Sequence, residues 1–286
     1  MGRSLPLLLL TTLVLVWPAQ AADLDGTLKK IKGANAITLG YREASRPFSF
    51  TGDDGKPTGY SVELCGRVAD SVAKQLGLSN MQVKWIKVTV ENRLQSVADG
   101  TIDLECGSTT ASLSRQEQVD FSLLTFVDGG SLLVTDASQI RGVATLGGKR
   151  VAIIPGTTTE RGLNDALKKH GVTATLVPVK DHDGGVAALD FGTADAYASD
   201  RVILIGIGRT SKHPEKLSLV EEMFSYEPYG LVLRRGDAAF RLSVNRALSA
   251  LYRSGDVVPI YEKWFGSMTT AGPIIGVMYM MNALPE

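Results

Sequence analysis

The sequence lacks the features that mark several large classes of protein. Its 286 residues include only 2 cysteines and 3 histidines, and the histidines have neither a partner four residues away nor a Cys-x-x-Cys pair beside them. Neither a Gly-x-Ser-x-Gly elbow nor a Walker loop is present. The 30 Lys and Arg balance the 30 Asp and Glu, and no basic stripe stands out. These absences argue against a metal site, a nucleic-acid partner, and the common hydrolase and nucleotide-binding motifs. No cofactor is expected.

A single long apolar run is present, at the N-terminus. It extends from Leu5 to Trp17, follows the single basic residue Arg3, and precedes Pro-Ala-Gln-Ala ending at Ala21. This order predicts an export signal over residues 1–21, cleaved after Ala21. A membrane anchor is the alternative, but the run is shorter than the roughly 20 residues that a bilayer requires. We therefore expect a protein exported to the periplasm.

The two cysteines are Cys65 and Cys106. An exported protein meets an oxidising compartment, where an even pair of cysteines favours a disulfide. The alternative is two buried free thiols, since sequence spacing does not give the distance between them.

Short β-branched runs alternate with helical patterns from residue 36 onward. In the first half the pattern predicts strands over 36–41, 82–88 and 102–105, with helices over 61–76 and 91–98. In the second half it predicts strands over 151–154, 175–179, 194–198 and 217–220, with helices over 159–169, 184–191 and after Asp200. This alternation is typical of α/β sheets, whose ligands lie at the carboxyl ends of the strands.

Two extended runs, 131–135 and 229–234, separate the two α/β units, and we interpret them as hinge strands. Helices over 239–253 and 257–265 are then expected to rejoin the first unit. The predicted architecture is two α/β lobes joined by two hinge strands. Lobe 1 comprises 22–132 and 232–286, and lobe 2 comprises 133–231. The apolar segment 274–284 has no evident role.

Charged and hydroxyl side chains gather where strands end or helices begin. The stretches are 42–49, 91–93, 107–115, 155–159, 180–182 and 199–200. Such positions open into one crevice in α/β folds. The planar fork of an arginine matches a carboxylate, and Asp200 is the natural acceptor for an ammonium. The ordinary interpretations remain open: single arginines are usually solvated, and Thr157 or Asp200 suit the capping of a helix. Spacing alone predicts a polar cleft without naming its ligand.

Taken in order, these stretches resemble the type 3 extracellular solute-binding proteins of polar amino-acid transporters, most closely their glutamate/aspartate-binding branch. The resemblance spans nearly the whole chain after residue 21. The segment Cys-Gly-Ser-Thr-Thr at 106–110, followed by Arg-Gln at 115–116 and by Lys-Asp-His at 180–182, is specific to the acidic branch. Pro-Phe-Ser-Phe at 47–50 and Trp-Phe at 264–265 mark only the wider family.

The resemblance implies the Venus-flytrap fold of periplasmic binding proteins, with an amino acid held between the lobes. The implied ligand-binding set is Arg42, Ser45, Arg93, Ser108, Thr110, Arg115, Thr157, Thr158, His182 and Asp200. Arg115 is expected to clamp the α-carboxylate, helped by Thr110 and the backbone after Thr157. Ser108 and Asp200 are expected at the α-ammonium. Arg42, Arg93 and His182 are expected around the distal carboxylate. Hydroxyls of Thr157 and Thr158 are expected to add donors.

The charges of this set suit an acidic ligand. Three arginines and one aspartate give the site a charge of about +2, and a neutral ligand leaves two buried arginines unpaired at a cost of several kcal/mol. Two departures from the family pattern stand out. Arg46 adds a cation to the first loop, where it faces solvent or enlarges a positive cleft, and Ser199 stands where a second acid is expected beside Asp200.

The sequence favours a monomeric transport receptor that hands an acidic amino acid to the permease of an ABC transporter. One alternative is a periplasmic lyase on the same fold, in which His182 or Glu105 serves as the general acid or base. Others are a soluble sensor lobe and a binder of another dicarboxylate or polar amino acid. The sequence does not choose between glutamate and aspartate.

Overall fold

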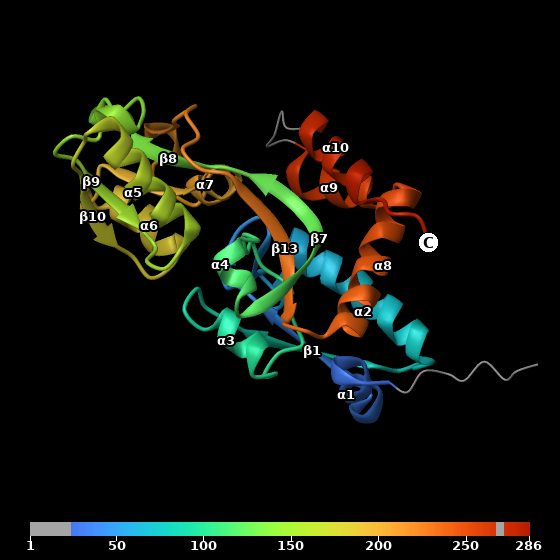
Figure 1. Ribbon diagram of the computed structural model, residues 1–286. Helices are drawn as coiled ribbons and strands as arrows, with labels where there is room; N and C mark the ends of the chain where they lie inside the picture. The colour runs from blue at the N-terminus through green and yellow to red at the C-terminus, as the bar shows by residue number, and fades with distance from the viewer. Residues whose placement is uncertain (1–23, 267–271) are drawn as a thin grey trace, which may run out of the picture.

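The computed structural model describes residues 24–266 and 272–286, and over these residues the chain forms two α/β lobes (Figure 1). The expected export signal, residues 1–21, lies outside the described residues and stays a prediction. Within the described ranges, no helix has the length and apolar character needed to cross a bilayer.

Lobe 1 is built on a five-stranded sheet with the order β5-β1-β6-β13-β7. Its strands are β1 (Ala36–Tyr41), β5 (Gln82–Lys87), β6 (Leu104–Glu105), β7 (Val119–Asp128) and β13 (Glu227–Arg234). A small second sheet contains β2 (Ala44–Ser45), β3 (Ser49–Thr51) and β4 (Pro57–Thr58). Because β1 and β6 are parallel neighbours, their carboxyl ends meet at one edge, and so do the polar residues that follow them.

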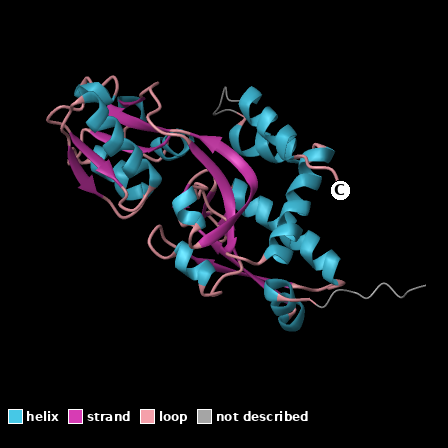
Figure 2. Ribbon diagram, in the orientation of Figure 1, coloured by secondary structure: helices cyan, strands magenta, loops and turns pink. Residues whose placement is uncertain are grey.

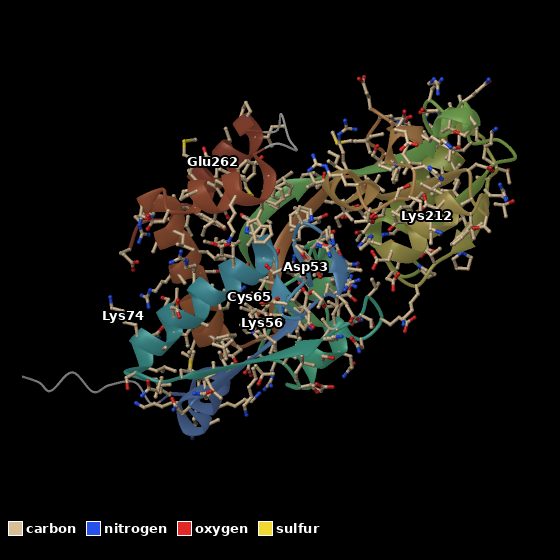
Figure 3. The ribbon with its side chains drawn as sticks, turned by 180° about the vertical axis from the view of Figure 1, so that it is seen from behind. Asp53, Lys56, Cys65, Lys74, Lys212 and Glu262 are labelled. Carbon is tan, nitrogen blue, oxygen red and sulfur yellow. A yellow bond between two sulfur atoms is a disulfide. The ribbon has the colours of Figure 1, made fainter. Side chains whose placement is uncertain are left out.

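The helices of lobe 1 are α1 (Gly26–Ala34), α2 (Tyr60–Leu76), α3 (Arg93–Ala98), α4 (Leu113–Gln116), α8 (Ala238–Ser254), α9 (Val257–Phe265) and α10 (Gly272–Asn282). Helical spacing places Leu64 and Val68 on the buried face of α2. The helix ends at Gly77, whose φ of 68° is a left-handed conformation that suits glycine. Cys65, on the same buried face (Figure 3), forms a disulfide with Cys106, and their Cα atoms are 6.1 Å apart. The bridge ties α2 to the segment that follows β6.

The apolar C-terminal segment belongs to the core of lobe 1. Helix α10 packs against β7 and α8 and lies beside α9 (Figure 1). It buries Ile275, Met278 and Tyr279. The hydroxyl of Tyr279 lies 2.6 Å from that of Tyr60 on α2. Segment 274–284 therefore covers β7, the strand at the edge of the lobe 1 sheet.

Lobe 2 has its own five-stranded sheet, in the order β10-β9-β11-β8-β12. The strands are β8 (Gly130–Thr135), β9 (Arg150–Ile153), β10 (Thr175–Pro178), β11 (Ala196–Asp200) and β12 (Leu217–Leu219). The helices are α5 (Thr158–His170), α6 (His182–Asp190) and α7 (Arg201–Gly208), with 3₁₀ turns at Asp136–Ser138, Val143–Thr145 and Pro214–Lys216. β9 is parallel to both β10 and β11, so the polar residues after these strands also share one edge.

The chain crosses between the lobes at the ends of long extended strands (Figure 2). β8 pairs with β11 from Gly130 opposite Asp200 onward and with β12 at its end, so it lies entirely in the sheet of lobe 2. β13 pairs with β7 from Glu227 opposite Asp128 onward, so it lies entirely in the sheet of lobe 1. We therefore place the crossings at Gly129 and within 220–226, earlier than the boundaries expected after residues 132 and 231. An extended run looks the same in either sheet, and its pairing partner decides which sheet it joins.

Element ends also differ from the expected ones in a way that matters for the site. The strand expected over 194–198 extends over Ala196–Asp200, which makes Asp200 the end of a strand. The helix expected over 184–191 begins at His182. Both shifts bring a predicted ligand residue to the exact edge where the lobes face each other.

Candidate functional site

A pocket between the lobes is lined by residues of both. It encloses about 410 Å³ of space, part of it open to solvent. Lobe 1 contributes Arg42, Val90, Arg93, Ser108, Thr110 and Arg115, and lobe 2 contributes Ile154, Thr157, Thr158, Thr159, His182, Ala198, Ser199, Asp200 and Ile203. The structure thus brings every predicted ligand residue except Ser45 into one lining.

Ser45 lies outside this lining, in β2 of the small sheet. It is fully buried, and its carbonyl accepts a hydrogen bond from the backbone N–H of Phe48. Its hydroxyl has no hydrogen-bond partner within 24–266 and 272–286. Closeness to Arg42 in sequence suggested a place in the site, but by Ser45 the chain has already entered the small sheet.

Three arginines reach the pocket from separate elements. Arg42 follows β1, Arg93 is the first residue of α3, and Arg115 lies on α4 with Nη1 donating to the carbonyl of Thr110 at 2.9 Å. Arg42 is 6% exposed and Arg93 3%. Burial lowers the pKa of Arg42, and burial with the neighbouring arginines lowers the pKa of Arg93 and of Arg115 to about 10. All three stay cationic at neutral pH.

Arg93 has hydrogen-bond donors that no described residue accepts. Its Nε and Nη1 are buried and have no hydrogen-bond partner among the described residues. A buried cation whose donors are unpaired costs several kcal/mol, so this guanidinium favours an anion in the pocket.

Glu105 lies next to the arginines and changes the charge of the site. It is fully buried at the end of β6, and neither of its oxygens has a hydrogen-bond partner in the described part of the chain. A Cβ on Gly107 would come within 2.2 Å of Oε1 of Glu105 and 3.0 Å of Cγ of Arg42. Glycine at 107 therefore lets the two charged side chains pack close together. The attraction of Glu105 offsets part of the burial effect on the pKa of Arg42.

His182 begins α6, and its Nδ1 lies 2.6 Å from the hydroxyl of Tyr197. Burial, together with Arg42 and Arg93, lowers the pKa of His182 to about 3, so the ring is neutral at pH 7. Burial also raises the pKa of Tyr197, which keeps its proton at neutral pH. The neutral ring carries one hydrogen, so with the phenol as donor to Nδ1 the hydrogen sits on Nε2, which is then a donor toward the pocket. A ring with this pKa is a poor general base near neutral pH.

Asp200 ends β11 and accepts hydrogen bonds from Thr159 Oγ1 at 2.6 Å and from the hydroxyl of Tyr229. Its side chain makes no capping bond to α7, so the interpretation of Asp200 as a simple helix cap is wrong. Burial, and then the charge of Glu227, raise the pKa of Asp200 to about 7. The pocket thus holds a buried acceptor that gains from a nearby cation.

Residues 37–267 match the model of the bacterial extracellular solute-binding proteins, family 3. The chain belongs to this family. It is 42% identical over 269 residues to the L-glutamate/L-aspartate-binding protein of Pseudomonas aeruginosa, covering 92% of this chain and 88% of that protein. It is 34% identical over 251 residues to the glutamate/aspartate import solute-binding protein of Escherichia coli K12, covering 86% and 83%.

A solved structure of similar fold is an ancestral arginine-binding protein bound to arginine. It has a TM-score of 0.71 and 27% identity, covering 81% of this chain and 98% of that one. The family match makes this chain a solute-binding protein, and the relatives named here are solute-binding proteins rather than enzymes. The lyase alternative is not supported.

Several polar residues of this solute-binding protein behave differently from expectation. Thr157 caps α5: its Oγ1 accepts from Glu160 N–H at 3.0 Å and donates to the carbonyl of Ile154 at 2.8 Å. Its only hydroxyl hydrogen is therefore used within lobe 2. The guanidinium of Arg46 lies 4.0 Å over the ring of Phe50 and is not part of the pocket lining. Arg46 therefore lies outside the pocket, and its charge acts on Asp183 of lobe 2.

Two residues of the site were missed or undervalued from sequence. The sequence suggests Glu105 only as a general acid or base, whereas the structure places its charge close to Arg42. Glu227 was not considered, yet it is 1% exposed and accepts hydrogen bonds from Thr110 and Thr158. The sequence does place a charged residue, Glu227, at the start of an apolar strand, and this pattern could have identified it.

Proposed function

We propose that this solute-binding protein captures an acidic amino acid, glutamate or aspartate, between its lobes and delivers it to the permease of an ABC transporter. One observation carries the proposal: the guanidinium groups of Arg42 and Arg93, both buried, and of Arg115, which is half-buried, converge from separate elements on one interlobe pocket. The names of the relatives from P. aeruginosa and E. coli support the same ligand class.

The polarity of the pocket matches such a ligand group by group. Arg115 lies with Thr110 at one part of the lining and is assigned to the α-carboxylate. Asp200 is the assigned acceptor for the α-ammonium, because its buried carboxylate gains from a cation. Arg42, Arg93 and the Nε2–H of His182 are assigned to the distal carboxylate.

Selectivity follows from what the wrong ligand leaves unpaired. With Glu105 and Glu227 included, three arginines face three carboxylates, so the site is less positive than the sequence suggests. The charges of Glu105 and Asp200 act on Arg93 too, but no carboxylate accepts a hydrogen bond from its Nε or Nη1 among the described residues. A neutral amino acid leaves them without an acceptor, and a basic one adds a cation next to Arg42 and Arg93.

Lobe closure is part of binding, because both lobes contribute to the lining. The ligand must bind the closed arrangement far better than the open one, or it does not shift the equilibrium between them. Export with cleavage after Ala21 is supported by the N-terminal sequence pattern.

The proposal is tested by a thermal-shift screen of the twenty amino acids with citrate, succinate and glutathione. A ligand that binds only the folded protein stabilises it by RT ln(1 + [L]/Kd), which is about 2.7 kcal/mol at 100 times Kd. We expect the largest shift with glutamate or aspartate and no chemical change in either. A largest shift with a neutral or basic amino acid would reject the assigned ligand class.

A further inference from the structure

Glu227 connects the two lobes through a single oxygen. It is the first residue of β13, where the chain re-enters lobe 1, and it is 1% exposed. Its Oε2 accepts from Thr110 Oγ1 and from Thr158 Oγ1, each at 2.6 Å. Thr110 belongs to lobe 1, and Thr158 opens helix α5 of lobe 2. The other oxygen, Oε1, accepts from Ser225 Oγ at 2.6 Å.

The direction of these hydrogen bonds is fixed by chemistry. An ionised carboxylate only accepts, and a threonine hydroxyl has one hydrogen, so both threonines point that hydrogen at Glu227. The 3.1 Å separation of the two threonine oxygens then brings their lone pairs together beside the pocket. Both hydroxyls are left as acceptors toward a ligand. This reverses the donor role expected for Thr110 and Thr158.

We propose that Glu227 is a positioning residue with two effects: it latches the lobes in the closed arrangement, and it presents the Thr110 and Thr158 oxygens as acceptors for an ammonium. The latch itself does not depend on which ligand binds, whereas the ammonium preference rests on the proposed function. Hydrogen bonds to a charged group are roughly twice as strong as neutral ones. The two bonds to Oε2 of Glu227 therefore stabilise the closed arrangement.

Glu227 is also connected, through Thr110, to Arg115, the residue assigned to the α-carboxylate. Thr110 donates its hydroxyl to Glu227 and accepts from Arg115 Nη1 at its carbonyl, at 2.9 Å. Thr110 also forms a β-bridge with Tyr229, two residues after Glu227. The opposite charges of Glu227 and Arg115 attract each other and raise the pKa of Arg115 against the effect of burial. Glu227 thus holds Thr110 and Arg115 in one arrangement.

The latch is tested without any ligand by pulsed EPR on a spin-labelled pair, Glu91→Cys and Lys180→Cys. Both positions are exposed and line the groove beside the pocket, one in each lobe. Both native cysteines are in the disulfide, so the labels attach only at the new positions. In Glu227→Gln, the amide keeps the shape but only one acceptor, so we expect the ratio of closed to open protein to fall about tenfold.

Matched controls separate the latch from a general loss of structure. Glu222→Gln changes a half-buried carboxylate of the same crossing segment, which accepts from Val143 N–H within lobe 2. It should leave the distance distribution unchanged. Thr158→Val should open the lobes as Glu227→Gln does, and Thr158→Ser, which keeps the hydroxyl, should restore closure. Combining Thr158→Val with Glu227→Gln should open the lobes no further than either change alone.

The ammonium preference is tested with L-glutamate and with glutarate, which has both carboxylates and no ammonium. A weaker latch lowers the affinity of every ligand that binds the closed arrangement, so isothermal titration should show that Glu227→Gln weakens glutarate by up to about tenfold and glutamate about tenfold more than that. Equal losses for the two ligands would overturn the acceptor role, and wild-type distances in both Glu227→Gln and Thr158→Val would overturn the latch. If wild-type protein binds neither glutamate nor aspartate, the proposed function fails, and the ligand-free distances still decide the latch.

Discussion

The hydroxyl of Tyr197 lies 2.6 Å from Nδ1 of His182, and both groups are buried. We assign the protonated phenol as the donor and Nδ1 as the acceptor, which gives the neutral ring its Nε2–H form. A histidine between two arginines thus serves as a hydrogen-bond donor without adding a third charge.

Replacing Tyr197 with phenylalanine should weaken acidic-ligand binding about tenfold, because Nδ1 loses its donor and the ring is free to adopt the other tautomer. Isothermal titration measures the affinity, and ¹⁵N NMR of the imidazole reports the tautomer. If neither the nitrogen spectrum nor the affinity changes, Tyr197 does not set the tautomer of His182 and does not contribute to ligand binding.

Arg42→Ala should lower the affinity for glutamate about 100-fold, since charge-assisted hydrogen bonds to the distal carboxylate are lost. It should also reduce the free energy of unfolding by about 3 kcal/mol, because Glu105 is left buried without its counter-ion. Adding Glu105→Gln should restore stability without restoring affinity. The matched control is Arg46→Ala, which removes only a cation over Phe50 and should bind as wild type. Wild-type affinity in Arg42→Ala would reject the distal clamp.

Acidification should weaken binding below about pH 7. The α-ammonium favours ionised Asp200, whose pKa is raised to about 7 by burial and Glu227, so binding must expel a proton at lower pH. Affinity should fall by up to about tenfold per pH unit between about pH 7 and 5. Burial and Asp200 also raise the pKa of Asp128, which titrates with the same cluster. His182, with a pKa of about 3, should not contribute.

The stability of the ligand-free protein should change with pH in the opposite direction and decrease as the pH rises. The pKa of Asp200 in the folded state is raised from 3.8 to about 7, so its contribution is complete below pH 3.8 and is lost as the pH rises through 7.

The protons that ligand binding expels are counted by titration calorimetry in buffers of different ionisation enthalpy. Asp200→Asn should abolish that proton release, and its persistence would assign the release to another group.

Removing the Cys65–Cys106 bridge should destabilise lobe 1. The bridge closes a loop with a sequence separation of 41, for which chain entropy gives about 4 kcal/mol. Ligand affinity should also fall, because Cys106 comes two residues before Ser108 in the pocket lining. Urea unfolding of the double variant Cys65→Ala/Cys106→Ala measures the first effect and titration the second. Equal midpoints for variant and wild type would contradict the expected role.

Most of the architecture was predictable because periodicity is a local property. The buried face of α2 follows from apolar residues at helical spacing, and the alternation of strands and helices predicts two α/β units. The pairing of the extended segments could not be predicted in the same way. β8 and β13 look alike in sequence, and only their partners, β11 and β7, assign them to different lobes.

The site divides in the same way. By itself the sequence determined the kinds of group available: three arginines, a histidine and an aspartate at the ends of predicted elements, in an order shared with a binding family. Tertiary structure alone decided which of them meet, which hydroxyls donate, and which acids are counter-ions. Glu227 and Thr110 are 117 residues apart in the chain, and Glu105 shows no local pattern that marks it as buried beside Arg42. Hydrogen-bond direction and pKa depend on partners and on exclusion of water, and both arise only when distant segments pack together.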